Sequence, residues 1–179
     1  MTIKISVFIA TSLDGFIARK NGDIDWLIAA GDSGEDNGYR EFISSVDLLV
    51  MGRYTYEKAL TFDPWPYPDK KVIVLSRGQP RIPRGLADKV EVLDQSPRDI
   101  LKTLTGYGAQ HVYLDGGKTI QQFLRDGLVD EMTITLIPLL IGDGLPLFGL
   151  LEHDVKLRLI KSKSFKNGFV QSKYAVEKA

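Results

Sequence analysis

The sequence predicts a single α/β sheet, mostly parallel, that is flanked by helices and ends in an antiparallel hairpin. In the first two thirds of the chain, short apolar runs alternate with segments of helical periodicity, a pattern typical of parallel strands covered on both faces. The last third holds three longer β-rich segments, and Asn167-Gly168, a strong hairpin signal, separates the last two. With 179 residues and no internal repeat, residues 1–179 are expected to form one domain.

Each element has its own signal in the sequence. Strands are expected at residues 3–10, 46–51, 71–76, 90–93, 111–114, 132–140, 155–165 and 169–176. Helices are expected over residues 39–45, 55–60, 96–104 and 119–128. The third helix has the clearest start, because Ser96 suits the N-cap, Pro97 suits the first turn and Asp99 follows three residues after the cap.

Composition excludes several classes of function. Lys plus Arg and Asp plus Glu both number 23, so the chain lacks the basic excess of a nucleic-acid-binding protein. It has no cysteine, which excludes disulfides, thiolate metal sites and cysteine nucleophiles. His111 and His153 stand apart in the sequence, so no metal site is expected.

We expect no membrane association and a location in the cytoplasm. The first residues lack the apolar run of a signal peptide. The most apolar stretch, Leu136 to Leu151, is interrupted by Gly142, Asp143, Gly144 and Pro146, which a membrane-spanning helix would not tolerate.

The turn from Leu114 to Thr119 is the clearest candidate for a binding site. It follows a predicted strand and begins a predicted helix, and Gly116 and Gly117 allow a ligand to approach the backbone closely. The free N–H groups of a helix N-terminus favour phosphate there, although a tight turn that binds nothing fits the same pattern. A P-loop would need glycine where Val112 stands, and no G-x-G-x-x-G motif is present.

Two further turns of this type follow predicted strands. They are Met51–Thr55, with Gly52 and Arg53, and Leu75–Gly78, with Ser76 and Arg77. In open α/β sheets ligands bind beyond the carboxyl ends of the strands. Together with Lys118, these side chains would form a basic pocket that suits the 2′-phosphate of NADPH. Each arginine alone would also fit a solvated surface charge.

The chain resembles the dihydrofolate reductase superfamily, most closely the branch of the bacterial riboflavin-biosynthesis reductase (RibD C-terminal domain-like). The segments that carry the resemblance are IATSLDGFIA (9–18), DIDWL (23–27), MGRYTYE (51–57), VIVLSR (72–77), DGGKTIQQFL (115–124) and LVDEMTITLIPLLIGDGLPLF (128–148). Their order covers nearly the whole chain. The resemblance implies a dihydrofolate reductase-like fold and NADPH as cofactor.

The resemblance also implies roles for individual residues. Ala10 and Ile17 would contact the nicotinamide, and Phe8 and Trp26 would lie at the substrate ring. Asp36 is the best match to the family's catalytic acid, which would also bind substrate. The remaining cofactor positions are Gly52, Arg53, Thr55, Leu75, Ser76, Arg77, Gly116, Gly117, Lys118 and Thr119.

The acid and the substrate stay open at this stage. The stretch from Trp26 to Asp36 is longer than in folate reductases, so Asp32 and Glu35 compete for the acidic role. Asp36 could equally satisfy the free N–H groups of a helix. Lys70 stands where a folate reductase has an arginine for the substrate carboxylate, which disfavours folate.

Three functions agree with these observations. The first is an NADPH-dependent reductase that transfers a hydride to a small nitrogen heterocycle, pterin- or dihydrofolate-like. The second is a 5-amino-6-(5-phosphoribosylamino)uracil reductase-like enzyme of riboflavin biosynthesis. The third is a nucleotide-binding protein without turnover.

A homodimer is expected, as in the riboflavin-type branch. The segment from Leu136 to Leu151 carries more apolar side chains than one sheet edge covers easily, and a large exposed apolar patch often marks an interface. The residues of this expected patch are Leu139, Leu140, Ile141, Leu145, Leu147, Phe148, Leu150 and Leu151. The alternative is that they cover the monomer's own core.

Overall fold

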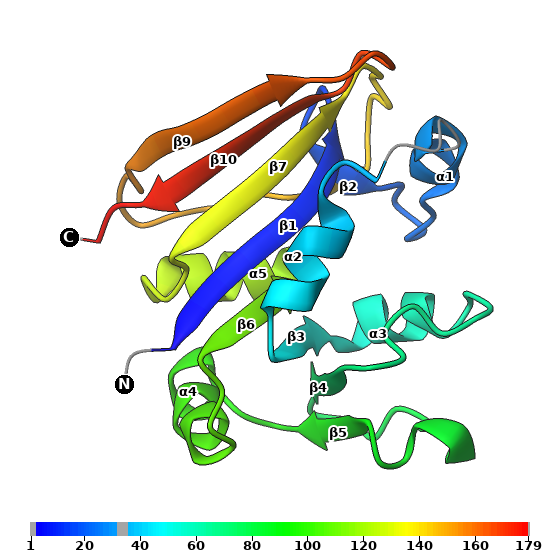
Figure 1. The fold of residues 1–179 in the computed structure, drawn as a ribbon, viewed down its shortest axis with the longest axis vertical. Coiled ribbons are helices and arrows are strands. Elements are labelled where there is room, and N and C mark those ends of the chain that lie inside the picture. The colour runs from blue at the N-terminus through cyan, green and yellow to red at the C-terminus, as the bar shows by residue number, and fades with distance from the viewer. Residues whose placement is uncertain (1–2, 32–35, 179) are drawn as a thin grey trace.

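The computed structural model describes residues 3–31 and 36–178, and one large sheet runs through it (Figure 1). Eight strands lie in the order β5-β4-β3-β6-β1-β7-β10-β9. In chain order they are β1 (Lys4–Ser12), β3 (Leu48–Gly52), β4 (Lys71–Leu75), β5 (Val90–Leu93), β6 (His111–Asp115), β7 (Glu131–Ile137), β9 (Leu157–Ser164) and β10 (Val170–Val176). Pairing is parallel from β5 through β7, and β10 and β9 add the antiparallel hairpin. The predicted fold class is therefore confirmed.

Helices cover the two faces of the parallel part. They are α1 (Asp25–Gly31), α2 (Tyr39–Ser45), α3 (Arg53–Ala59), α4 (Pro97–Gly106) and α5 (Gly117–Arg125), with a short 3-10 helix, η1, at Arg84–Leu86. On one face, apolar side chains of α4 and α5, such as Leu104 and Phe123, pack in one cluster with Leu114 of the sheet. On the other face, Phe42 of α2 and Tyr56 of α3 belong to a second cluster, which includes Met51 of β3.

Local sequence explains where the helices begin. The Ser96 hydroxyl accepts the N–H of Asp99 at 3.2 Å and donates to the Asp99 carboxylate at 2.7 Å, so the predicted cap of α4 is confirmed. Helix α5 begins directly after Gly116, whose φ of 88° lies in the left-handed region that favours glycine. The predicted hairpin at Asn167-Gly168 is present, with φ of 86° at Gly168.

Some elements differ from the prediction. Strand β7 ends at Ile137 and not at residue 140, because Pro138 has no N–H to donate to a neighbouring strand. The placement of Leu147 in the exposed patch is wrong: it is 1% exposed and belongs to the core beside α5. A small antiparallel pair, β2 (Phe16–Ala18) with β8 (Leu145–Pro146), and helix α1 lack a clear periodic signal.

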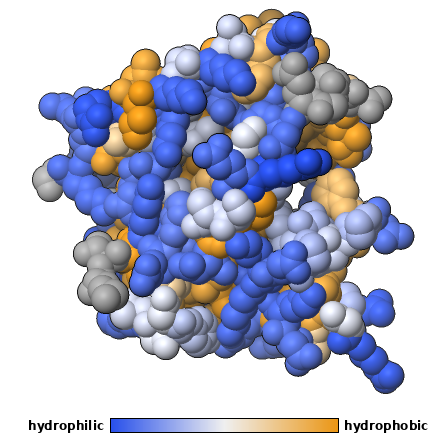
Figure 2. All heavy atoms as spheres, in the orientation of Figure 1, coloured by the Kyte–Doolittle hydropathy of each residue, from blue (hydrophilic) through white to orange (hydrophobic). Residues whose placement is uncertain are grey.

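Within the described part of the chain, no helix is long and apolar enough to cross a membrane. The face seen in Figure 2, with α2 toward the viewer, is mostly hydrophilic, and hydrophobic atoms show between the polar ones.

Candidate cofactor and substrate site

Two of the predicted phosphate turns lie against each other at the carboxyl ends of β3 and β6. A methyl group on Gly116 would collide with the Thr55 hydroxyl and lie 3.3 Å from the Thr55 Cβ. A methyl group on Gly52 would lie 2.8 Å from the Thr119 hydroxyl. The two glycines therefore allow the two turns to pack in close contact.

The third turn, after β4, joins this edge through Arg53. The Ser76 hydroxyl accepts the N–H of Gly78 at 3.1 Å, and Arg53 Nη1 lies 3.2 Å from the position of a Cβ on Gly78. Arg53 also donates to Glu57 at 2.7 Å, and this carboxylate raises the pKa of Arg53. The structure thus brings Arg53 and Ser76 together, while the neighbouring Arg77 is exposed.

Lys118 completes the polar rim of the turn after β6. Its side chain is exposed, and its ammonium lies 5.8 Å from the centre of the Tyr54 ring. Leu75, the last residue of β4, packs instead against the core on the α5 side.

The residues expected at the nicotinamide lie between these turns and the first strand. The Ile17 side chain comes within 2.8 Å of where a Cβ on Gly117 would stand, so it directly adjoins the turn after β6. Ala10, near the end of β1, packs with the cluster of Trp26, Ile137 and Phe169.

Phe8 and Trp26, expected at the substrate ring, come from β1 and α1. The Phe8 ring stacks on Phe42 with 4.9 Å between centres and meets Tyr39 edge-on at 5.6 Å. Trp26 is 4% exposed and packs in one cluster with apolar side chains of β7 and the hairpin turn. Phe8 and Ala10 alternate with core residues of β1, so both face the side of the sheet that α2 covers.

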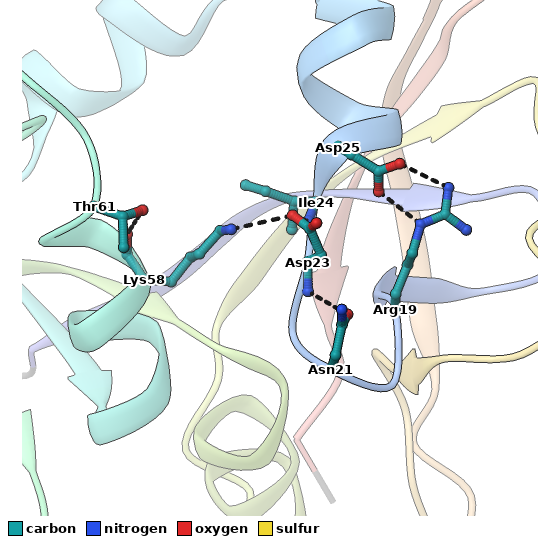
Figure 3. A network of polar contacts seen from close by, with 7 residues as sticks. All are labelled: Arg19, Asn21, Asp23, Ile24, Asp25, Lys58 and Thr61. Atoms are coloured by element: carbon teal, nitrogen blue, oxygen red, sulfur yellow. Dashed lines mark hydrogen bonds and ion pairs between the residues drawn. The ribbon is translucent and has the colours of Figure 1, made fainter.

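A polar network fixes the turn that leads into α1 (Figure 3). Arg19 donates to both carboxylate oxygens of Asp25, at 2.6 and 2.9 Å. One carboxylate oxygen of Asp23 accepts the N–H of Ile24 at 2.8 Å and the ammonium of Lys58 in α3 at 3.2 Å. The turn that precedes α1 is therefore tied to α3, the helix that begins at one of the predicted phosphate turns.

Asp36, the expected acid, lies shortly before α2. Its carboxylate accepts the N–H of Arg40 at 3.1 and 3.2 Å, and its side chain is 39% exposed. This contact is the capping role that the sequence leaves open as an alternative. The catalytic role of Asp36 stays a prediction. The competing residues Asp32 and Glu35 lie outside the described residues.

Lys70 occupies a structural position. Its ammonium donates to the carbonyl of Val46, the residue that follows α2, at 2.5 Å. A cation at the C-terminus of a helix satisfies a carbonyl that has no partner within the helix.

Asp115 is a polar residue at this edge to which the sequence assigned no role. It ends β6, and its carboxylate accepts the N–H of Gly116 at 2.7 Å. Burial raises the pKa of Asp115 to about 6, against the lowering effect of that hydrogen bond. Asp115 follows Tyr113 by two residues in β6, so it faces the side of the sheet that α2 covers.

The charge of Asp115 acts on three tyrosines. The negative charge of Asp115 helps to raise the pKa values of Tyr39, Tyr67 and Tyr113, after the larger effect of their burial. These residues come from α2, from the loop before β4 and from β6, so only the fold brings them together. The sequence signal was a carboxylate that directly follows the apolar run of a central strand.

Among residues 3–31 and 36–178, no three His, Asp or Glu side chains gather closely enough to hold a metal ion. The polar groups of this edge instead suit an anionic organic ligand, since backbone N–H groups, hydroxyls and cations predominate there.

The chain belongs to the RibD C-terminal domain family, whose model matches residues 3–171. It is 36% identical to the Bacillus subtilis protein YwjB over 168 residues, which cover 92% of this chain and 94% of YwjB. Its structure is similar to that of a Shewanella sp. PV-4 protein named for riboflavin biosynthesis, with 43% identity, a TM-score of 0.91, and coverage of 98% and 100% of the two chains.

A dihydrofolate reductase from Enterococcus faecalis, solved with NADP(H), shares the fold at a TM-score of 0.66 and 16% identity over 98% of this chain and 97% of that chain. The family and the fold that the sequence resembled are therefore confirmed.

Proposed function

We propose that the protein is an NADPH-dependent reductase that transfers a hydride to a small nitrogen heterocycle, pterin- or dihydrofolate-like. The observation that carries this proposal is the meeting of three glycine-containing turns at one sheet edge, beside Ile17. The reductase of Enterococcus faecalis that shares the fold was solved with NADP(H), which supports the same cofactor.

The residues fit the cofactor in physical terms. Gly52, Gly116 and Gly117 allow the turns to pack closely together, because a Cβ at any of them would press on a neighbouring turn or side chain. The N-terminus of α5 offers free N–H groups to phosphate oxygens. The side chains that would hold the 2′-phosphate are those of Arg53, Ser76 and Arg77, because guanidinium groups match phosphate geometry.

The chain's own residues would then orient the reactants. When bound, the reduced nicotinamide supplies the hydride. Ala10 and Ile17 would position the nicotinamide ring, and Phe8 and Trp26 would form the apolar wall of the substrate pocket.

A carboxyl group would deliver the proton that accompanies reduction. Asp36 is the candidate from the sequence. Asp115 is a second candidate, because its raised pKa of about 6 suits proton transfer near neutral pH.

A 5-amino-6-(5-phosphoribosylamino)uracil reductase-like activity is the second candidate function. The family and the similarity to the Shewanella protein named for riboflavin biosynthesis favour it. A protein that binds the nucleotide without turnover is the third candidate, and it would bind NADPH without ever oxidising it.

The experiment that tests this proposal is NADPH oxidation with three kinds of substrate: dihydrofolate, dihydrobiopterin and the riboflavin pyrimidine intermediates. Oxidation that depends on one substrate identifies it. Tight NADPH binding without oxidation by any of them would favour the third candidate.

We also propose that the protein is a homodimer, with residues 1–179 as one domain. All eight residues of the edge strand β9 are exposed, including Leu157, Leu159 and Ile160. Beside it, on the side of the sheet opposite α2, lies a groove of about 180 Å³. Exposed apolar side chains that gather on one surface often mark an interface, and a second copy is the commonest partner. The lining of the groove includes Ile134, Leu136, Phe148 and Tyr174.

A further inference from the structure

A second cavity lies at the amino ends of β1, β6 and β7, where α2 crosses the sheet (Figure 1). Its volume is about 320 Å³, and its lining includes Ser6 of β1 and His111, the first residue of β6. Gly116 follows the other end of β6, about 17 Å from His111, because a strand rises about 3.3 Å per residue. The cavity is therefore separate from the proposed cofactor site.

Ser6 and His111 form a hydrogen-bonded pair in the lining of this cavity. His111 Nε2 lies 2.8 Å from the Ser6 hydroxyl oxygen, and His111 Nδ1 lies 3.0 Å from the carbonyl oxygen of Ser45. A carbonyl oxygen can only accept, so Nδ1 carries the proton of the neutral imidazole and the Ser6 hydroxyl donates to the lone pair of Nε2. The imidazole is thus oriented as a base toward a serine hydroxyl.

The surroundings of His111 favour the neutral imidazole that this role requires. Burial lowers the pKa of His111, and the positive charge of Lys4 acts in the same direction. The hydrogen bond to Ser45 and the carboxylates of Glu131 and Asp47 oppose this, but the pKa stays below its usual value. A histidine that is neutral near pH 7 can accept a proton from a hydroxyl group.

The position of His111 is fixed from two sides. The Asp47 carboxylate accepts the N–H groups of Gln110 and His111 at 2.7 and 2.8 Å, which holds the start of β6. The ring of Phe42 meets the imidazole edge-on, with 6.2 Å between the ring centres. A nucleophile, a base and a third group that orients the base are the recurring parts of nucleophilic catalysis, and Ser6, His111 and the Ser45 carbonyl supply them.

Two ammonium groups line the same cavity. Lys4 and Lys173 each lie 2.9 Å from the same carboxylate oxygen of Glu131, so this group of three side chains carries a net positive charge. Glu131 pairs with Ser6 across β1 and β7, which places the group beside the serine. Positive charge there would stabilise the oxygen of a carbonyl group that the serine attacks. Glu41 of α2 is the other carboxylate of the lining.

We propose that the protein also hydrolyses small acyl esters in this cavity, with Ser6 as the nucleophile and His111 as the general base. Ser6 Oγ bonds to the acyl carbon, His111 Nε2 takes the hydroxyl proton, and the bond to the leaving alcohol oxygen breaks as His111 protonates it. Water is the second substrate. It gives a proton to His111 and adds to the acyl carbon, the acid leaves, and Ser6 Oγ regains its proton from His111. The volume of the cavity limits the acyl group to a short chain.

The test uses two probes on the full chain, p-nitrophenyl acetate and diisopropyl fluorophosphate. The wild type should release p-nitrophenolate over many turnovers. The fluorophosphate should stop this release, because Ser6 Oγ bonds to phosphorus, the P–F bond breaks and fluoride leaves. Mass spectrometry of the peptides should then locate the label on Ser6.

Three variants sharpen the test. Ser6→Ala should reduce hydrolysis to the rate without protein, and His111→Gln should reduce it about 10²-fold or more. Ser44→Ala is the matched control, because Ser44 lies on the exposed side of α2, donates to the carbonyl of Glu41 at 2.8 Å and should not affect the rate. Circular dichroism checks the fold of each variant, and the wild-type labelling stands even if His111→Gln fails to fold.

The outcomes are independent of the reductase proposal, because ester hydrolysis uses neither NADPH nor the three turns. Hydrolysis by the wild type that is lost in Ser6→Ala, with the label on Ser6, supports the inference. No hydrolysis by the wild type, a label only on other residues, or undiminished hydrolysis by Ser6→Ala overturns it. NADPH oxidation by the wild type is measured separately and decides only the reductase.

Discussion

Replacing Asp115 with asparagine should change the pH dependence of stability. In the folded protein the pKa of Asp115 is raised by burial to about 6, from an ordinary value of 3.8. The stabilising effect of protonation is therefore fully present below about pH 4 and is lost as the pH rises through about 6. The difference between the two pKa values corresponds to about 3 kcal/mol, because one pKa unit is worth about 1.4 kcal/mol. Asparagine keeps an oxygen that can accept from Gly116 and never ionises.

Urea unfolding of both proteins at about pH 4 and about pH 8 measures this effect. Relative to that of the wild type, the free energy of unfolding of Asp115→Asn should rise by up to about 3 kcal/mol between the lower and the higher pH. If the free energies of unfolding of the variant and the wild type differ by the same amount at both pH values, the pKa of Asp115 is not raised in the folded protein. Turnover then separates the candidate acids: the variant of the true acid, Asp115→Asn or Asp36→Asn, should lose about 10²-fold in rate while NADPH binding persists.

Three further predictions concern binding and assembly. Arg77→Ala should weaken NADPH binding by roughly 1–3 kcal/mol and leave NADH binding unchanged. Arg84→Ala is the surface control. If calorimetry shows equal losses of affinity for the two cofactors, Arg77 does not bind the 2′-phosphate. Gly116→Ala should lose at least about tenfold in NADPH affinity. Alanine at the positive φ of Gly116 costs about 1–2 kcal/mol, and its methyl group meets Thr55. Gly127 also has a positive φ but has open space around it, so Gly127→Ala is the control and should keep its NADPH affinity. Phe148→Asp should give a folded species of about 20 kDa in light scattering if the wild type is a dimer, whereas an unchanged doubled mass would place the interface elsewhere.

The sequence predicts most of the fold because the strong elements have strong local signals. The strands of the parallel part are continuous apolar runs, and α4 has a complete cap at Ser96 and Asp99. The short β2 and β8 pair has no such signal, since two or three residues cannot show a period. Leu147 looked like part of an exposed patch, but the fold buries it beside α5.

The site is predictable only in part. The glycines and cations of the turns are readable because each follows a strand, and parallel strands end at one edge. The raised pKa of Asp115 depends on burial by segments far apart in the chain. The contact between Ser6 and His111 is likewise a consequence of the fold, because the two residues lie far apart in the sequence.

We propose that this sheet edge holds NADPH for hydride transfer to a heterocycle. The most direct measurement uses NADPH that carries deuterium on the nicotinamide, with each candidate heterocycle, and analyses the reduced product by mass spectrometry. We expect deuterium in the product ring and a matching amount of oxidised cofactor. Tight binding of NADPH with no deuterium in any product would contradict it.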